Sequence, residues 1–434
     1  MSIFGAMFSG VSGLNAQSQS LGMISDNIAN VSTVGYKGSV SRFSTLVTTA
    51  ASKTTFSPGG VQSNTTQLID RQGLLQASSS PTDVAIVGRG FFVVNESNAP
   101  GLGDEFFYTR AGSFNPDQDG FLVNTAGLYL MGWPTDPNGV PNVGNLTSLT
   151  SLQPVSVAGI AGSAVTTTTA SLGANLPATA ANGATETVTV KIFDSLGVEH
   201  NLQFTYTKQS ANTWRLSVQN PTDAISGTTS GTVAFNGGAD LDVVFNGDGT
   251  LAGYDTDTDG TVDTGTLPNV AISGWTTGAV DSTIAVNMGT QNQADGLTQY
   301  ANDFTTYFIN QNGVRFGTFS GVTIDENGIV TALFDNGETT AIYKLPLATF
   351  ANPNGLQAVS GNLYRESDTS GQVLLNEAGT GNAGGVSPNS LESANVDIAT
   401  EFTNMIITQR AYSASAKIIT TADDMIDELI RIKR

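Results

Sequence analysis

The chain has 434 residues, contains no cysteine and carries a net charge of −20, from 17 basic and 37 acidic residues. This length exceeds what one hydrophobic core supports and predicts two or three domains. The shortage of basic residues excludes binding to nucleic acid or to anionic membrane surfaces, which needs clustered lysine and arginine. The lack of cysteine excludes disulfides, thiolate metal sites and cysteine nucleophiles.

The N-terminal segment, residues 1–36, is predicted to be a helix that needs a partner. Its only charged residue is Asp26, and Gly35 is a suitable helix stop. Internal glycines each cost up to about 1 kcal/mol relative to alanine, so we expect the helix to be stable only when packed. Its apolar residues recur at the spacing of a helix seam: Phe4, Met7, Val11, Leu14, Leu21 and Ile28.

The same segment differs from a conventional secretory signal, because no basic residues precede its apolar positions and glycine and serine interrupt them. No apolar run in the chain reaches the roughly 18 residues that a transmembrane helix needs. The low content of charged residues, 12% of the chain, is typical of β-rich extracellular proteins. We therefore expect an extracellular protein that uses another export route and does not insert into a membrane.

Between the two ends, short β-branched and aromatic runs alternate with glycine, asparagine and aspartate, which predicts strands and turns. The tract 145–289 is richest in threonine, glycine and aspartate and is predicted to be an outer β domain. It would be inserted into an inner β domain made of residues 76–144 and 290–369. Residues 37–75 and 370–390 have little periodicity and are predicted to be linkers.

The clearest strand signals are at Val84–Val94, Thr187–Phe193, Leu202–Thr207, Asp242–Phe245 and Gly328–Phe334. A turn motif recurs between strands, at Phe114–Leu122, Phe245–Leu251 and Ile324–Val330. In each case an Asp-Gly or Asn-Gly pair supplies the positive φ of a tight turn.

One acidic loop resembles a calcium site, since Asp255, Asp257, Asp259 and Asp263 have the spacing of calcium ligands. The twelfth position is Thr266 instead of the bidentate glutamate, and no predicted helices flank the loop. Aspartate beside glycine is also ordinary turn chemistry. The two interpretations are a calcium loop and an acidic hairpin loop, and we favour the hairpin.

No group of residues predicts a catalytic or cofactor site. His200 is the only histidine, which excludes histidine metal clusters and catalytic triads, and we expect a strand residue near a turn. Gly88-Arg-Gly90 lacks the lysine and the serine or threonine of a phosphate-binding loop and is expected to be a structural β segment. We therefore predict a protein that is not an enzyme and needs no cofactor.

The C-terminal segment, residues 391–434, contains no glycine or proline and is predicted to be the second helix, with a capping box at Asn389 and Glu392. Arg410 and Lys417 are charges on an otherwise apolar helix, either in contact with another subunit or exposed to solvent. Its apolar seam consists of Ile398, Phe402, Met405, Tyr412, Ala416, Ile419, Ile426 and Ile430. Further apolar residues widen the stripe and favour burial against other copies: Ile406, Ile407, Ile418, Met425 and Leu429.

Three parts of the chain resemble the flagellar axial proteins, the family of rod, hook and hook-associated subunits. The first part is Ile24–Lys37, which reads ISDNIANVSTVGYK. The second is Thr82–Phe92 with Tyr108–Phe114 and Asp119–Val123, and the third is Ser393–Tyr412 with Lys417 and Thr421–Met425. The matches occur in the family's order and at both ends of the chain.

The resemblance implies a subunit of an extracellular helical tube, exported by the flagellar type III apparatus. The insertion at 145–289 is similar to the outer domain of hook subunits, which form a flexible joint that transmits motor torque to the filament. The expected partners are copies of the same chain, the distal rod, the hook cap and the hook–filament junction proteins. The alternatives are a distal rod or hook-associated protein of the same family, or a calcium-stabilised β-rich adhesin.

The predicted fold is therefore multidomain α+β, with two coiled-coil-like terminal helices and two mainly-β domains, the outer inserted into the inner. Polymerisation is assigned to the helices of residues 1–36 and 391–434. The residues expected to mediate it are Val11, Leu14, Leu21, Ile28, Ile398, Phe402, Met405, Tyr412, Ile419 and Ile426.

Overall fold

The computed structural model describes residues 3–46, 59–101, 103–235, 237–238, 240–256, 261–263 and 268–432. The chain forms two compact units. The first unit consists of Met1–Gly159, Gly321–Ala332 and Thr339–Arg434, and the second of Ile160–Ser320 and Leu333–Glu338. The second unit is thus inserted into the first, and the predicted multidomain α+β fold with terminal helices is confirmed.

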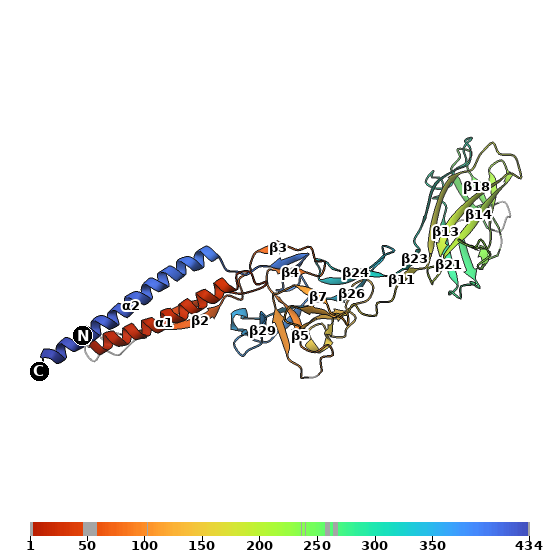
Figure 1. Cartoon of the computed structure of the whole chain (residues 1–434). Helices are drawn as coiled ribbons and strands as arrows, with labels where there is room; N and C mark the ends of the chain where they lie inside the picture. The colour runs from red at the N-terminus through yellow and green to blue at the C-terminus, as the bar shows by residue number, and fades with distance from the viewer. Residues whose placement is uncertain are drawn as a thin grey trace. The chain divides into compact units, whose positions relative to one another are not determined.

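The two terminal helices lie side by side and antiparallel in the first unit (Figure 1). The first is α1, Ile3–Ala29, and the second is α2, Ile398–Ile432. Gly35, in the turn that follows α1, has a φ of +71°, and a Cβ there would lie 2.6 Å from the backbone nitrogen of Ala111. Only glycine fits this turn, because it is both left-handed and tightly packed.

The predicted capping box of α2 is wrong. The carboxylate of Asp397 accepts a hydrogen bond from the backbone N–H of Thr400 at 2.7 Å and caps the helix instead. This bond also lowers the pKa of Asp397. Glu392 lies five residues earlier in a short strand, so the helix starts later than the lack of glycine and proline suggests.

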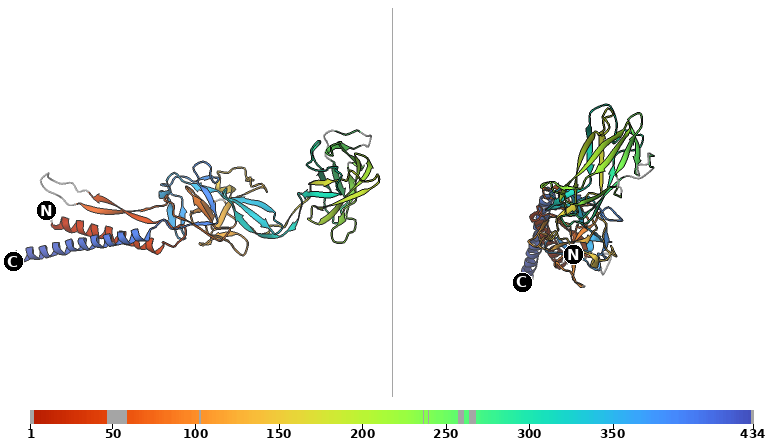
Figure 2. Two further views of the ribbon diagram at one scale, coloured as in Figure 1. Left: turned by 90° about the horizontal axis from the view of Figure 1, so that it is seen from above. Right: turned by 90° about the vertical axis from the view of Figure 1, so that its right-hand side faces the viewer.

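A two-stranded hairpin runs along α1 (Figure 2). Its strands are β1, Ser39–Leu46, and β2, Gly60–Gln67, paired antiparallel from end to end. The hydroxyl of Ser12 on α1 accepts a hydrogen bond from the backbone N–H of Val61 at 3.2 Å. The sequence predicted a linker at 37–75, because both strands are rich in serine and threonine and lack alternating apolar residues.

The β body of the first unit is a branched sheet with two apolar clusters. Its main path, in spatial order, is β24 (Phe319–Ile324), β25 (Ile329–Phe334), β26 (Thr339–Lys344), β9 (Tyr129–Pro134), β5 (Phe91–Asn95), β6 (Phe106–Thr109), β29 (Leu363–Arg365) and β28 (Gln357–Val359). The branches are β7 (Phe114–Pro116), β8 (Leu122–Asn124), β10 (Gln153–Pro154), β27 (Leu347–Thr349) and β30 (Leu374–Asn376).

Two short strand pairs join the beginning of the β body to the segment before α2. β3, Leu75–Ala77, pairs with β32, Ser390–Glu392, and β4, Val84–Val87, pairs with β31, Gly385–Pro388. All four strands are only three or four residues long, so pairing between distant parts of the chain fixes them rather than local propensity. Gly88 and Gly90, both with positive φ, separate β4 from β5 inside the run that was predicted as one strand.

The second unit consists of two main sheets around one apolar cluster. One sheet has the spatial order β17 (Thr232–Phe235), β20 (Asn269–Ser273), β21 (Ser282–Asn287), β12 (Thr169–Asn175) and β22 (Thr305–Gln311). The other has β13 (Thr185–Phe193), β14 (Glu199–Ser210), β15 (Thr213–Val218), β18 (Leu241–Phe245) and β19 (Leu251–Asp255), with β16 (Thr222–Asp223) beside β14. β11, Ser163–Val165, pairs with β23, Val314–Gly317.

The second unit differs at both ends from the predicted outer domain, 145–289. Residues 145–159 belong to the first unit, where β10 pairs with β9. Residues 290–320 belong to the second, where β22 pairs with β12. These pairings join distant segments, so the local hydrophobic pattern contains no sign of them. The three predicted Asx-Gly turns are confirmed, with positive φ at Gly120, Gly249 and Gly328.

Candidate functional site

The point where the terminal helices leave the β body contains a buried ionic cluster. The ammonium group of Lys37 lies 2.5 Å from one carboxylate oxygen of Glu392, and the guanidinium of Arg110 lies 3.2 Å from the other. All three side chains are at most 3% exposed. We call Lys37, Arg110 and Glu392 the junction cluster.

Backbone groups complete the junction cluster. Lys37 also donates to the carbonyl of Arg71 at 2.7 Å, and the N–H of Gly73 donates to Glu392 at 2.7 Å. Arg110 donates to the carbonyl of Gly88 at 2.7 Å. Burial lowers the pKa of Lys37 and that of Arg110, and the charge of Glu392 partly offsets this. A buried charge is costly unless it is paired, so moving any of the three side chains out of these contacts would be unfavourable. The network therefore holds the three chain segments in fixed positions.

The junction cluster brings together the three parts of the chain that carry the family resemblance. Lys37 ends the first part, Arg110 lies in the second, and Glu392 directly precedes the third. Asn395, inside the third part, accepts from the N–H of Gly38 at 2.8 Å and donates to the carbonyl of Leu68 at 2.9 Å. Sequence reasoning missed this convergence, because the three residues lie far apart in the chain and each motif also contains other charged residues.

Small residues line the contact between the two helices. A Cβ added to Gly10 would lie 3.0 Å from Ile419, and one added to Gly13 would lie 3.0 Å from the hydroxyl of Ser415. Ala16 is buried as well. The glycines that weaken α1 as an isolated helix therefore let it approach α2 closely.

The predicted polymerisation residues are distributed over several faces of the two helices. Met405, Ile419 and Ile426 on α2 and Leu14, Leu21 and Ile28 on α1 are half-buried. The remaining four are exposed in the single chain: Val11, Ile398, Phe402 and Tyr412. Their role in polymerisation remains a prediction.

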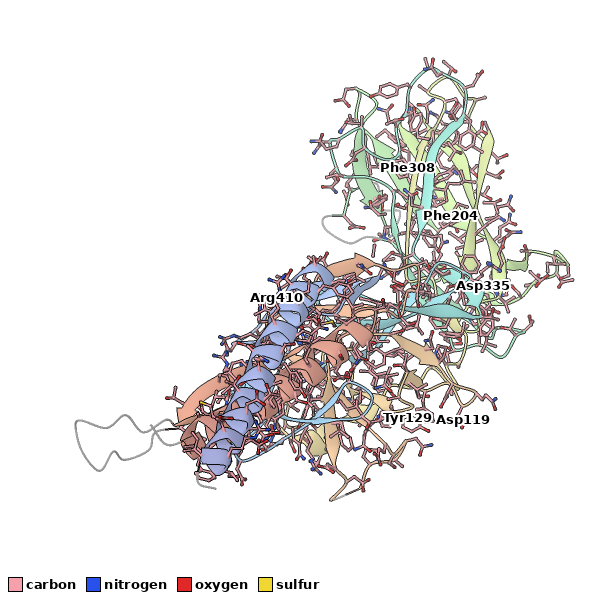
Figure 3. The ribbon with its side chains drawn as sticks, turned by 60° about the vertical axis from the view of Figure 1, so that its left-hand side comes forward. Asp119, Tyr129, Phe204, Phe308, Asp335 and Arg410 are labelled. Atoms are coloured by element: carbon pink, nitrogen blue, oxygen red, sulfur yellow. The ribbon has the colours of Figure 1, made fainter. Side chains whose placement is uncertain are left out.

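α2 carries a second apolar face that the single chain leaves open. Its residues are spaced by eleven, seven, four and three positions, which places them on one side of a helix: Ile407, Ile418, Met425, Leu429 and Ile432, which are 47–75% exposed. Ala414 lies among them, and with Ala6 of α1 it borders a shallow apolar pocket. We call Ile407, Ala414, Ile418, Met425, Leu429 and Ile432 the open face of α2. Arg410 and Lys417 are exposed; Lys417 borders the same pocket, and Figure 3 labels Arg410.

A buried carboxylate lies near the beginning of α2. Glu401 is 9% exposed, and burial raises its pKa, while the side chain of Asn27 on α1 forms a hydrogen bond with it that partly opposes the shift. Asn27 in turn accepts from the N–H of Ser39 at 2.9 Å and donates to the carbonyl of the same residue. Glu401 thus belongs to a polar contact that joins both helices and the start of β1.

The candidate residues of the second unit, His200 and the acidic loop, form contacts that stabilise the fold. His200 is fully buried in β14, with Nε2 3.2 Å from a carboxylate oxygen of Asp194, and its ring lies against that of Trp275 at an interplanar angle of 32°. Thr277 donates to the same carboxylate at 2.7 Å. In the acidic loop, Asp263 accepts from the backbone N–H and the hydroxyl of Thr256.

Two of the four loop aspartates, Asp257 and Asp259, lie outside the described residues. The described part of the chain contains no group of three or more histidine, cysteine or acidic side chains placed to hold a metal ion. Within the same residues, neither α1 nor α2 has the length and hydrophobicity that crossing a bilayer requires.

Four family models match the chain. They are the flagellar basal body rod protein at residues 7–37, the flagellar hook protein FlgE/F/G D1 domain at 85–178, the flagellar basal body protein FlaE D2 domain at 160–314, and the flagellar basal body rod FlgEFG protein C-terminal region at 387–432. The first and last cover most of α1 and α2, and the two between them cover most of the β regions.

Curated relatives match over the full length. The flagellar hook protein FlgE of Brucella suis is 36% identical over 440 residues, and that of Caulobacter vibrioides is 32% identical over 592, each covering 100% of both chains. Among solved structures, the Helicobacter pylori flagellar hook protein FlgE2 aligns with a TM-score of 0.48 at 15% identity, covering 73% of this chain and 100% of that one. The full-length matches to the curated relatives do not favour the adhesin alternative.

Proposed function

Because the chain belongs to the flagellar hook protein family, we propose that it assembles into the hook through α1 and α2, with the junction cluster fixing how the two helices leave the β body. The family places the protein in the flagellum, as a structural subunit of the hook. The assignment of assembly to particular helix residues is our proposal.

The open face of α2 is the observation that supports this assignment most directly. Soluble proteins rarely leave a continuous apolar stripe exposed unless another molecule covers it. Ile407, Ile418 and Met425 are each about half exposed, so covering one of them would contribute on the order of 1 kcal/mol. A chain repeated many times in a tube gains this stabilisation at every copy.

Helix formation and assembly would be coupled. Ordering a residue costs about 1–2 kcal/mol of backbone entropy, and the 35 residues of α2 bury few side chains in the single chain: only Glu401, Thr408 and Ala422. We expect the helices to be largely unfolded in the free subunit and to form when neighbouring copies cover the open face.

The remaining partners follow from the place of a hook in the flagellum. Such a tube begins on the distal rod, grows under a cap and ends at the proteins of the hook–filament junction. The subunit would reach the growing end through the type III export apparatus. An unfolded helical end before assembly suits passage through a narrow export channel.

Truncation tests the assignment. Removing residues 398–432 should leave a soluble β-folded protein that forms no tubes at any concentration, as judged by electron microscopy and sedimentation. A second experiment compares two variants, Ile418→Glu and Ser413→Glu. Both add a negative charge to α2, but only Ile418 lies on the open face. We expect only the first to abolish tubes, and tubes formed by the truncated chain would refute the proposal.

A further inference from the structure

The junction cluster contains more positive than negative charge. Lys37 and Arg110 carry two cations, and Glu392 is the only carboxylate among the described residues that forms an ion pair with either. Asp70 acts on Lys37 from a longer distance and is itself exposed. Buried charges are normally matched by partners, because desolvation makes an unmatched one costly.

The guanidinium of Arg110 has a hydrogen-bond donor that the described residues leave without an acceptor. Its guanidinium donates to Glu392 and to Gly88 and lies over the ring of Phe91, 5.2 Å from the centroid. Within the described structure, its Nε has no hydrogen-bond partner, although the residue is only 3% exposed. A buried guanidinium with a free N–H is a ready site for a carboxylate or phosphate oxygen.

A polar pocket of about 300 Å³ opens beside this group. It is lined by Arg110, Arg89, Asp70, Asn352, Asn382 and Phe91, among others. Arg89 is exposed at the pocket, and among the described residues its guanidinium forms one long hydrogen bond, of 3.4 Å, to the side chain of Asn382. The residues that line the pocket thus include two arginines and three asparagines, but only one carboxylate residue, Asp70.

We propose that this pocket is an anion-binding subsite that receives a carboxylate side chain from a second copy of the chain during assembly. We infer a carboxylate of another copy as the bound group because each copy has 37 acidic residues and only 17 basic ones. A net charge of −20 makes copies repel one another over most of their surface, and a basic pocket is where an acidic group of a neighbour gains most. This inference rests on the proposed assembly of the chain into a tube.

The test reverses the exposed charge of the pocket in the full-length protein. Arg89→Glu should raise the critical concentration for tube formation at least about tenfold, because it removes a charge-assisted contact and adds repulsion. Arg365→Glu is the control, since Arg365 is a partly exposed arginine of the same unit outside the pocket, where it contacts Glu105. The control should stay within about twofold of the unaltered chain.

Thermal melts of the free subunits check that Arg89→Glu still folds, and if it does not, the neutral Arg89→Gln takes its place with a smaller expected increase. Unchanged assembly of the charge-reversed chain would overturn the inference. A free anion is the competing occupant and is probed with inorganic phosphate. A phosphate-dependent rise in melting temperature that Arg89→Glu abolishes, with assembly unaffected, would assign the pocket to a free anion and also overturn it. Failure of the unaltered chain to form tubes would instead refute the proposed function.

Discussion

The ammonium group of Lys37 and the carboxylate of Glu392 lie 2.5 Å apart although 355 residues separate them in the chain. The contact closes the chain into a loop, with the β body and the inserted second unit between its ends. Because Lys37 follows the end of α1 and Glu392 precedes the start of α2, this ion pair holds together the points where the chain leaves α1 and enters α2. The position of the assembly helices therefore depends on one buried carboxylate.

Glu392→Gln should destabilise the first unit strongly, since it leaves two buried cations without a counter-charge. Removing one member of a buried ion pair typically costs about 3–5 kcal/mol. Denaturant unfolding followed by circular dichroism would measure the change. The control is Glu377→Gln, which breaks the partly exposed pair with Lys344 and should cost less than about 1 kcal/mol. Equal effects of the two variants would contradict a special role for the cluster.

Gly10→Val should weaken assembly, because its first side-chain carbon would lie only 3.0 Å from Ile419 and its methyl groups would crowd α2 further. Gly22→Ala is the matched change on the same helix, at a position with no atom of its surroundings within 4 Å. It should stabilise α1 by about 0.8–1 kcal/mol through helix propensity alone. Sedimentation would show a higher critical concentration for the first variant and an equal or lower one for the second. Assembly of Gly10→Val at the unaltered concentration would show that the helices do not pack through this seam.

Glu401→Gln should remove a pH dependence from the helix pair. Burial raises the pKa of Glu401 above its ordinary 4.5. A carboxyl with a raised folded pKa contributes its stability fully below the unfolded pKa, and this contribution is lost as pH rises through the folded value. Glutamine keeps a partner for Asn27 without the charge. In assembled tubes, the variant should lose helical signal at a higher temperature than the unaltered chain at about pH 7, and at a similar temperature at about pH 4. A variant less stable at pH 7 would mean that Glu401 acts as a needed charge.

The sequence predicted the features that local periodicity encodes. Both helices and the Asx-Gly turns could be found because apolar spacing and turn residues lie within a few positions of one another. The hairpin of β1 and β2 was missed because its polar strands have no apolar alternation. The junction cluster was missed because its three members are brought together only by pairing of distant strands, and Glu392 even suggested a helix cap. Gly10 and Gly13 were interpreted as a cost to α1, since their contact with α2 cannot be seen in a single segment.

The second unit should be dispensable for tube formation. The buried residues of its apolar cluster lie between Ala170 and Leu297, and among the described residues the two clusters of the first unit share none of them. Ser163 and Gly317 face each other as partners in the β11–β23 pair, so a short glycine–serine link can replace the chain between them. We expect the shortened chain to keep the melting transition of the first unit and to form tubes of altered stiffness or curvature, seen by electron microscopy. A shortened chain that keeps its fold but forms no tubes would show that contacts between second units are needed for assembly.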